Sequence, residues 1–415
     1  MRKGVMFSFI MVFITMSILA MIALQNSLVL QRREQIFIET RINGMNHMHE
    51  SMVKDIDKSL KIITRRAVNV AFSNATYVEA NQPPQPLDEA NETLAELILN
   101  GTIKNSYEPF MENATFTYWT NKIKELSILK GFNLDFEISL LEVKPYDYIH
   151  LLVKTELNIN ISDRQVDAEI NRSVVVNSIV SLEGLEDPFY PMYSNLFGSN
   201  TIRRSPYIGN YTQLLLVGSG GNSHAYGMTT NDTGNFNEKI LIVHNASEVP
   251  GLSNALGVIS ETDIVPPPLV IPYLVNSSAL SLIQNGMNVL LDGNNGVNPK
   301  VWFIDNFIKD TENSYYHPSE EGPSYLDRLE GRFFTHDKYK QANKTIGLES
   351  FVNKLDLYYS GATIIQEKTN VDYIYFSTSS PTFKKVKGLD KLTPDPYFRI
   401  DDEHKGVYNV TDLVY

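Results

Sequence analysis

Residues 5–24 form an uncharged stretch, VMFSFIMVFITMSILAMIAL, and this stretch constrains the fold more than any other feature of the sequence. A helix of these 20 residues is long enough to cross the hydrocarbon core of a bilayer, which is about 30 Å thick. A cleaved secretory signal would have an apolar run of only about 7–15 residues, followed by a small-residue cleavage site. Because Gln25 and Asn26 lead into more helix-compatible sequence instead, we predict a retained, single-pass membrane anchor.

The residues around this stretch predict which side of the membrane each part of the chain occupies. Arg2 and Lys3 precede the span and favour a cytoplasmic N-terminus with the long remainder outside, although Arg32 and Arg33 follow the span. Acceptor sites for asparagine-linked glycans, Asn-x-Ser/Thr, recur along that remainder. They lie at Asn74, Asn91, Asn100, Asn113, Asn160, Asn171, Asn210, Asn231, Asn245, Asn276, Asn343 and Asn409. We therefore expect a glycoprotein in the cell membrane whose C-terminal domains are extracellular.

The composition excludes several classes of protein. The chain has no cysteine among 415 residues, so it has no disulfide framework, thiol nucleophile or cysteine-ligated metal. Its net charge of −12 argues against a nucleic-acid partner, which would need a basic face. Apolar and charged contents of 43% and 20% are globular values. An ectodomain rich in glycan acceptor sites but without disulfides fits an archaeal cell surface.

The apolar pattern beyond the anchor has the period of a helix. Apolar residues recur at spacings of three or four along one face; they are Ile38, Ile42, Met45, Met48, Met52, Ile56, Leu60, Ile63, Ala67 and Val70. No proline interrupts this pattern, so we predict one continuous helix from about Val5 to Phe72. The outer half of this helix needs a cover, which either the following domain or other copies of the chain must provide.

After the break at NQPPQP (81–86), the pattern predicts two shorter helices at 88–99 and 116–129 and then a sheet. Three segments alternate apolar and polar residues and are separated by turn residues, which predicts three long antiparallel strands. They are FNLDFEISLLEVK, YIHLLVKTELNINIS and AEINRSVVVNSIVSLEG. We predict an α+β fold in which this sheet packs on the outer half of the long helix.

Shorter strand-like runs follow a polar, glycine-rich region. They are KILIVH, PLVIPYLV, MNVLLD, KVWFID, VDYIYFS and FRIDDEHKGVYNV. These runs predict a β-rich, sandwich-like extracellular domain. The predicted organisation is a leader (1–4), a transmembrane and amphipathic helix (5–75), an α/β domain with the antiparallel sheet (76–187) and the β-rich domain (188–415).

The N-terminus resembles the class III signal peptides of archaeal type IV pilin-like proteins, in which a basic residue and glycine directly precede an uncharged helix. By this resemblance Lys3 and Gly4 form the site of a prepilin peptidase, and Val5 is the mature N-terminus. The long helix under an antiparallel sheet is also similar to that superfamily. The fifth mature residue is Phe9, whereas polymerising pilins usually carry glutamate there, so the resemblance leaves filament assembly open. The segments SLEGLEDPFYP and GPSYLDRLEG also resemble parts of archaeal pilin-like surface proteins.

The resemblance implies a structural, assembly or adhesive role at the cell surface, with membrane lipid and other copies or pilin-like subunits as partners of the helix. A surface glycan or protein is a further possible partner of the outer domain. The alternatives from other classes are a tethered extracellular hydrolase and a glycan-binding or sensory ectodomain. We predict no catalytic residue, cofactor or bound metal, and a structural Ca²⁺ is the alternative for the cofactor.

Three groups of residues are candidates for metal sites. His47 and His49 on the long helix point about 200° apart, because they are two residues apart, and do not share an ion. Oxygen ligands for Ca²⁺ occur at Asp401, Asp402 and Glu403, beside His404, and in the turn with Asp292, Asn294 and Asn295. For both we favour solvated polar residues at strand ends. We interpret GSGG (218–221) as an external loop, because no lysine and helix follow it.

Two other features have structural and functional interpretations. Asp327, Arg328 and Glu330 form a buried ion-pair network, a polar groove or a charged turn against the outer domain, and we favour the turn. The 22 tyrosines and 20 phenylalanines suit a glycan or protein contact where they are exposed. The tyrosines considered for this role are Tyr190, Tyr193, Tyr315, Tyr316, Tyr358 and Tyr359.

Overall fold

The computed structural model describes residues 2–77, 83–196, 198–208, 211–214, 225–226, 240–243, 257–260, 289–292, 300–365, 367–378, 383–386, 389, 398–408, 410–411 and 414. The chain divides into two compact units. Unit 1 comprises Met1–Ala67, Glu92–Val143 and Leu152–Val180, and unit 2 comprises Val68–Asn91, Lys144–Leu151 and Ser181–Tyr415. The division into the four ranges expected from the sequence remains a prediction.

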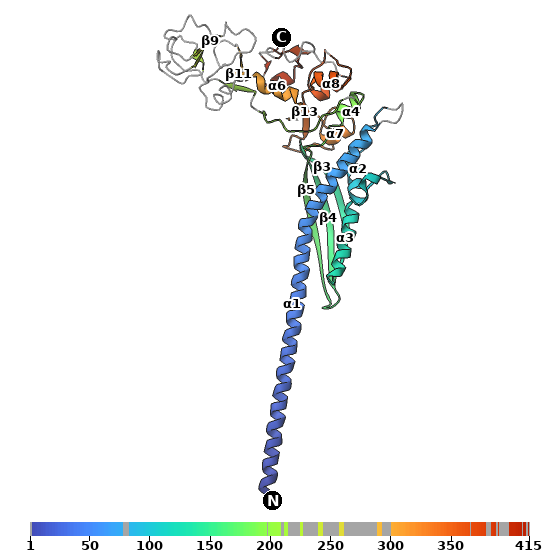
Figure 1. Cartoon of the computed structure of the whole chain (residues 1–415), viewed down its shortest axis with the longest axis vertical. Coiled ribbons are helices and arrows are strands. Elements are labelled where there is room, and N and C mark those ends of the chain that lie inside the picture. The colour runs from blue at the N-terminus through green and yellow to red at the C-terminus, as the bar shows by residue number, and fades with distance from the viewer. Residues whose placement is uncertain are drawn as a thin grey trace. The chain divides into compact units, whose positions relative to one another are not determined.

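Helix α1 runs unbroken from Arg2 to Thr76, over 75 residues. At about 1.5 Å per residue its length is on the order of 110 Å. The prediction of one continuous helix is confirmed, and the helix extends four residues past the expected end at Phe72 (Figure 1). The last turns of α1, from Val68 on, belong to unit 2.

The two parts of α1 differ in their surroundings. The large apolar side chains from Phe7 to Phe37 are exposed to solvent or half-buried. Burial begins at Met45 and continues on one face, at Met52, Ile56, Leu60, Ile63 and Ala67. The predicted stripe is therefore buried from Met45 except at Met48, which is half-buried, whereas Ile38 and Ile42 at its start are not buried.

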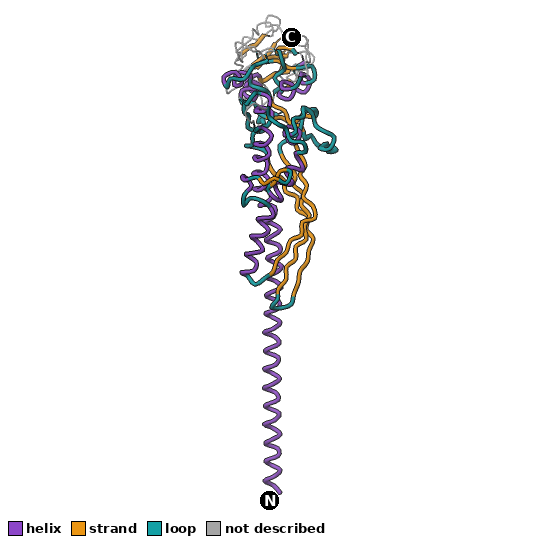
Figure 2. Tube along the Cα trace, turned by 90° about the vertical axis from the view of Figure 1, so that its right-hand side faces the viewer, coloured by secondary structure: helices purple, strands orange, loops and turns teal. Residues whose placement is uncertain are grey.

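A three-stranded sheet covers the stripe within unit 1. Strands β3 (Asn133–Asp147), β4 (His150–Asp163) and β5 (Ala168–Ser181) lie in the order β3-β4-β5. The turns between consecutive strands are short, so the sheet is antiparallel, as predicted. The three strands lie along one side of the α1 and α3 helices (Figure 2).

The central strand shows why this sequence forms a half-buried sheet. Every second residue of β4, from Leu151 to Asp163, is buried, and the residues between them are half-buried. This alternation places Val153, Leu157 and Ile159 on the face toward the helices. In β3 the inward phase changes between Ile138 and Leu141, which indicates a β-bulge in that strand.

Polar contacts fix the register of α1 against the sheet. The Arg41 guanidinium lies 2.5 Å from Asp163 Oδ2 and stacks on the Phe132 ring at 4.4 Å from its centroid. Further along the helix, the Ser178 hydroxyl donates a 2.9 Å hydrogen bond to Asp57 Oδ1. These contacts tie α1 to both ends of the sheet within unit 1.

Short elements connect α1 to the sheet. They are α2 (Ala90–Asn100), β1 (Thr102–Ile103), β2 (Ser106–Tyr107), the 3-10 helix η1 (Pro109–Met111) and α3 (Phe116–Leu129). The Thr115 hydroxyl caps α3 by accepting from the Tyr118 N–H at 3.0 Å. Gly131 has a φ of 80° just after the helix, which suits glycine at a C-terminal cap. The predicted range of α3 and this cap are confirmed, and α2 lies within two residues of its predicted range.

The described residues of unit 2 form helices and small sheets. The strands are β6 (Thr212–Leu214), β7 (Ala225–Tyr226), β8 (Ile240–Val243), β9 (Gly257–Ser260), β10 (Val289–Asp292), β11 (Lys300–Phe303), β12 (Tyr316–Ser319), β13 (Gly347–Ser350), β14 (Lys384–Lys385) and β15 (Arg399–Ile400). The helices are α4 (Phe189–Tyr193), α6 (Ile304–Glu312), α7 (Tyr325–Leu329), α8 (Lys354–Tyr359), α9 (Asp372–Phe376) and α10 (His404–Val407).

These elements correct two predictions and leave another open. FRIDDEHKGVYNV was predicted as a strand, but among its described residues only Arg399–Ile400 form one (β15), and His404–Val407 form helix α10. VDYIYFS was predicted as a strand, but its residues form helix α9, because Asp372 at its start is held by partners from β13 and α7. The strands of KILIVH, MNVLLD and KVWFID are present as β8, β10 and β11. PLVIPYLV lies outside the described residues, and a sandwich arrangement remains a prediction.

An aromatic core holds the C-terminal part of unit 2 together. Phe307 lies 4.7 Å from Phe351 and 4.8 Å from Phe398, measured between ring centroids. Tyr408 packs against the same group with its ring tilted, 4.7 Å from Phe351 between ring centroids. Buried polar side chains lie beside this core, and they are described in the next subsection.

Candidate functional site

The predicted processing site lies in the first turns of α1. Lys3, Gly4 and Val5 are all helical residues. Among the described residues, α1 is the one helix that is long and apolar enough to cross a membrane. The apolar side chains that follow are exposed along this part of the helix, as a lipid-facing surface requires.

The described glycan acceptor sites differ in exposure. Asn100, Asn113, Asn171 and Asn343 are exposed, whereas Asn74, Asn91 and Asn160 are half-buried. Each half-buried side chain has a hydrogen bond, with Val70, Tyr339 and Glu169 respectively. Asn210, Asn231, Asn245, Asn276 and Asn409 lie outside the described residues. The four exposed sites are therefore the best placed for glycan attachment.

Arg328 of α7 lies at the centre of a buried ion-pair cluster. Its Nη1 lies 2.5 Å from Asp187 Oδ2 and 2.9 Å from Asp372 Oδ2. Its Nη2 donates to the Leu348 carbonyl at 2.5 Å, and all three charged side chains are fully buried. Asp327 forms a capping box with Ser324 at the start of the same helix. The favoured interpretation of a charged turn was therefore wrong for Arg328, which is part of a buried network.

The same cluster joins the two segments that resembled archaeal surface proteins. Asp187 belongs to SLEGLEDPFYP and Arg328 belongs to GPSYLDRLEG. Asp187 also accepts from the Tyr316 hydroxyl at 2.7 Å, and Asp372 accepts from the Ser350 N–H at 3.0 Å. Burial raises the pKa of Asp372 to about 6 despite the nearby guanidinium. The cluster ties α7, α9, β12 and β13 together without a disulfide.

His404 of α10 forms a second buried cluster with carboxylates on both sides. Its Nδ1 lies 2.8 Å from Asp401 Oδ1, and its Nε2 lies 3.2 Å from Glu349 Oε2. The Tyr373 hydroxyl is 3.0 Å from Nε2, and the Tyr408 hydroxyl donates to Glu349 Oε1 at 2.5 Å. Although burial lowers it, the two carboxylates raise the pKa of His404 to about 10. The carboxylates on both sides therefore favour the protonated imidazole at neutral pH.

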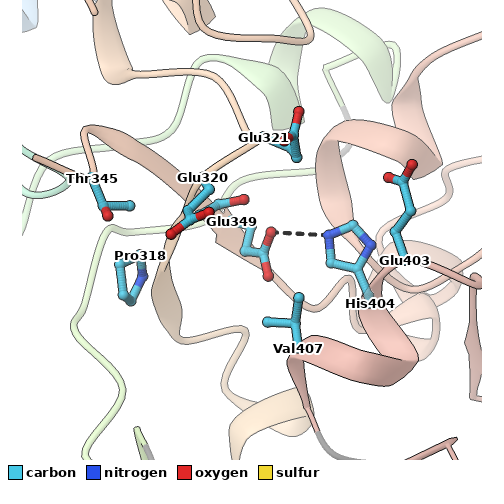
Figure 3. A pocket seen from close by; sticks show the side chains of 9 residues that line it. Pro318, Glu320, Glu321, Thr345, Glu349, Glu403, His404 and Val407 are labelled. Carbon is cyan, nitrogen blue, oxygen red and sulfur yellow. Dashed lines mark hydrogen bonds and ion pairs between the residues drawn. The ribbon is translucent and has the colours of Figure 1, made fainter. Parts of the chain in front are cut away.

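A cavity of about 710 Å³ opens beside this cluster. Figure 3 shows that Glu349 and His404 face each other. Glu403 and Val407 line the cavity on the same side as His404, and Glu320 lies beside Glu349. The turn that carries Glu320 and Glu321 packs closely on β13, because a Cβ at Gly347 would lie 2.0 Å from the Gly322 carbonyl oxygen. We call this space the Glu349 cavity.

A second cavity, of about 740 Å³, adjoins the first. Glu321 and Glu403 line both cavities. The second cavity is also lined by Phe333, Phe334 and Asp401, together with Tyr373, Ser377 and Asp402. We call it the Phe334 cavity, after the exposed aromatic ring in its wall. Both volumes fall in the range of ligand pockets, roughly 300–1,000 Å³.

The structure does not assemble a metal site from the described candidates. His49 is buried and His47 is exposed, so they face different sides of α1 as expected. The Asp401 carboxylate binds the His404 imidazole and two backbone N–H groups, while Asp402 and Glu403 are exposed. In the described part of the chain no group of three or more histidine, aspartate or glutamate side chains is placed to hold an ion. Asn294, Asn295 and residues 218–221 lie outside it.

The tyrosines considered for ligand contact have different positions. Tyr190 and Tyr316 are buried around the Arg328 cluster, and Tyr315 is half-buried. Tyr358 and Tyr359 are exposed, but they do not line either cavity. Sequence reasoning missed Phe334 and Glu349. The adjacent pair Phe333–Phe334, in the polar sequence GRFFTHD, was the available signal for the first of these.

Comparison with known proteins found no matching family model, no similar curated protein and no similar solved structure. The function therefore has to be argued from the residues and the geometry of this chain.

Proposed function

We propose that the chain is a membrane-anchored, pilin-like glycoprotein of the archaeal cell surface with a structural or adhesive role. In this proposal the first part of α1 spans the membrane after cleavage between Gly4 and Val5. The sheet of unit 1 stabilises the outer part of α1, and the β-rich domain at residues 188–415 faces the exterior.

The observation that carries the proposal is the change of surroundings along one unbroken helix. Side chains such as Phe9, Phe13 and Leu19 are exposed, so their apolar surface requires a lipid environment. From Met45 one face of the same helix is buried under the sheet of unit 1. An ordinary soluble helix does not combine 18 uncharged exposed residues (7–24) with a stripe buried by its own domain.

A stretch between these two parts supports a role in assembly. Leu28, Ile36 and Phe37 are exposed apolar residues that lie beyond the predicted span and before the first residue buried by the sheet. Arg32 and Arg33 divide this stretch and suit the headgroup region of the membrane. The apolar residues beyond them offer a surface for other copies or for pilin-like subunits.

Mass spectrometry of the mature protein from native membranes tests the proposal. We expect a chain that begins at Val5 and carries glycans on exposed sites such as Asn100 and Asn171. Substituting Gly4→Leu should block processing, while the matched change Ser8→Leu, inside the helix, should leave processing intact. A mature chain that begins after residue 25 would show that the anchor is removed and would contradict the proposal.

A further inference from the structure

The Phe334 cavity has an exposed aromatic ring whose neighbours in sequence are anchored. Phe334 is 70% exposed, although a side chain of its size is normally placed in the core. Its neighbour Phe333 packs on Phe189 at 5.3 Å and Tyr193 at 5.0 Å between ring centroids. On the other side, the Thr335 hydroxyl donates a 2.6 Å hydrogen bond to the Gly322 carbonyl. The backbone on both sides of Phe334 is therefore anchored, and its ring stands in the cavity wall.

Two of the carboxylates that line the same cavity, Asp401 and Asp402, have cationic partners. Asp401 is buried and bound by His404. Asp402 lies 2.5 Å from Lys405 Nζ and 3.8 Å from Lys384 Nζ. Because both carboxylates have cationic neighbours, much of their charge is balanced within the protein. They remain fixed acceptors that suit neutral hydroxyl donors.

We propose that the Phe334 cavity binds a glycan. The ring of Phe334 stacks on the apolar C–H face of a sugar, and the carboxylates of Asp402, Glu403 and Glu321 accept hydrogen bonds from its hydroxyl groups. Glu321 and Glu403 also line the Glu349 cavity, so the combined trough accommodates more than one sugar residue. The inference rests on the proposed function in one respect only, which is that the cavity is extracellular and so accessible to a surface glycan.

A basic ligand is the competing occupant, because Glu320, Glu321 and Glu403 are exposed carboxylates. The balanced charges of Asp401 and Asp402 favour the sugar, while the exposed phenyl ring suits either occupant. The two classes differ in their response to salt, since binding of a cation weakens as ionic strength rises whereas stacking on a neutral sugar does not.

The test uses the full chain in detergent, applied to an array of neutral hexose and N-acetylhexosamine oligosaccharides. The best-bound oligosaccharide is then measured by titration calorimetry at two salt concentrations. We expect Phe334→Ala to weaken its binding at least tenfold and Glu403→Gln to weaken it severalfold. The matched control is Tyr359→Ala, since Tyr359 is 78% exposed but lies outside the cavity, and its affinity should equal that of the unsubstituted chain.

The outcomes separate the possibilities. Absence of binding to every oligosaccharide on the array overturns the proposal, and so does binding that Phe334→Ala leaves unchanged. Spermine serves as the cationic probe. If the chain binds spermine in a salt-sensitive way, loses this binding in Phe334→Ala and binds no glycan, the cavity is a cation site instead. These measurements use the purified chain, so their result does not depend on whether the N-terminus is processed as proposed.

Discussion

Replacing Arg328 by methionine should destabilise unit 2 more than any surface substitution. The change keeps most of the side-chain volume but leaves the carboxylates of Asp187 and Asp372 buried without their cation. Removing one partner of a buried ion pair costs about 3–5 kcal/mol. For a cooperative unit of this size, 1 kcal/mol corresponds to about 2–4 °C, so the unfolding midpoint should fall by roughly 6–20 °C.

Thermal unfolding of the detergent-solubilised chain, followed by circular dichroism, measures this effect. The matched control is Arg203→Met, because the Arg203 side chain is exposed and its loss should change stability by no more than about 0.5 kcal/mol. Adding Asp372→Asn to the Arg328→Met chain should recover part of the loss, since it removes one of the uncompensated charges. Equal midpoints for Arg328→Met and Arg203→Met would refute the reasoning.

The pH dependence of the Arg328 cluster follows from Asp372. Its pKa in the folded chain, about 6, is above the ordinary value of 3.8 because of burial. A carboxyl group with a raised pKa favours the folded state most below pH 3.8, and this contribution is lost as the pH rises through about 6. The penalty of Arg328→Met should therefore be smaller at pH 5 than at pH 8. A penalty that does not change with pH would contradict this assignment.

Three further substitutions test other parts of the structure. Ile56→Ala on the buried face of α1 should cost about 2–5 kcal/mol in chemical denaturation, whereas Ile62→Ala on the same helix, where Ile62 is 72% exposed, should change little; similar losses for both would contradict the buried stripe. The pKa of His404 is raised from 6.5 to about 10, so the protonated imidazole stabilises the folded chain fully below pH 6.5, and this stabilisation is lost as the pH rises to about 10. His404→Gln should therefore destabilise the chain at pH 6 and should abolish the decrease in stability that the unsubstituted chain shows between pH 6.5 and 10. An unchanged pH–stability profile would argue against this. Thr115→Ala removes the cap of α3 and should cost about 1 kcal/mol, as measured by the same denaturation; no change would show that the cap does not stabilise the helix.

The parts of the fold that the sequence predicted are those with long, regular patterns. The stripe from Met45 to Val70 has the helical period over many turns, and β4 alternates along its whole length, so local pattern and tertiary burial agree. The segment of α9 contains only five helical residues. Its alternating aromatic residues looked like a strand, and the contacts of Asp372 with distant residues decide its conformation.

The candidate site was less predictable because its residues are far apart in sequence. Arg328 pairs with Asp187, which is 141 residues away, and Glu349 pairs with His404, which is 55 residues away. The pattern of a single sequence does not show which of these distant residues form pairs in the folded chain. It also does not distinguish Phe333, which packs on the core, from Phe334, which is exposed beside it.

The orientation of α1 in the membrane is the central claim, and cysteine labelling on intact cells tests it most directly. The chain has no cysteine, so a single cysteine introduced at Leu19, Ile62 or Lys340 is the one thiol of the chain that the reagent can label. A membrane-impermeant maleimide should label Cys at positions 62 and 340 from outside and should not label position 19. Labelling at 62 and 340 that appears only after the cells are opened would place these regions in the cytoplasm and contradict the account.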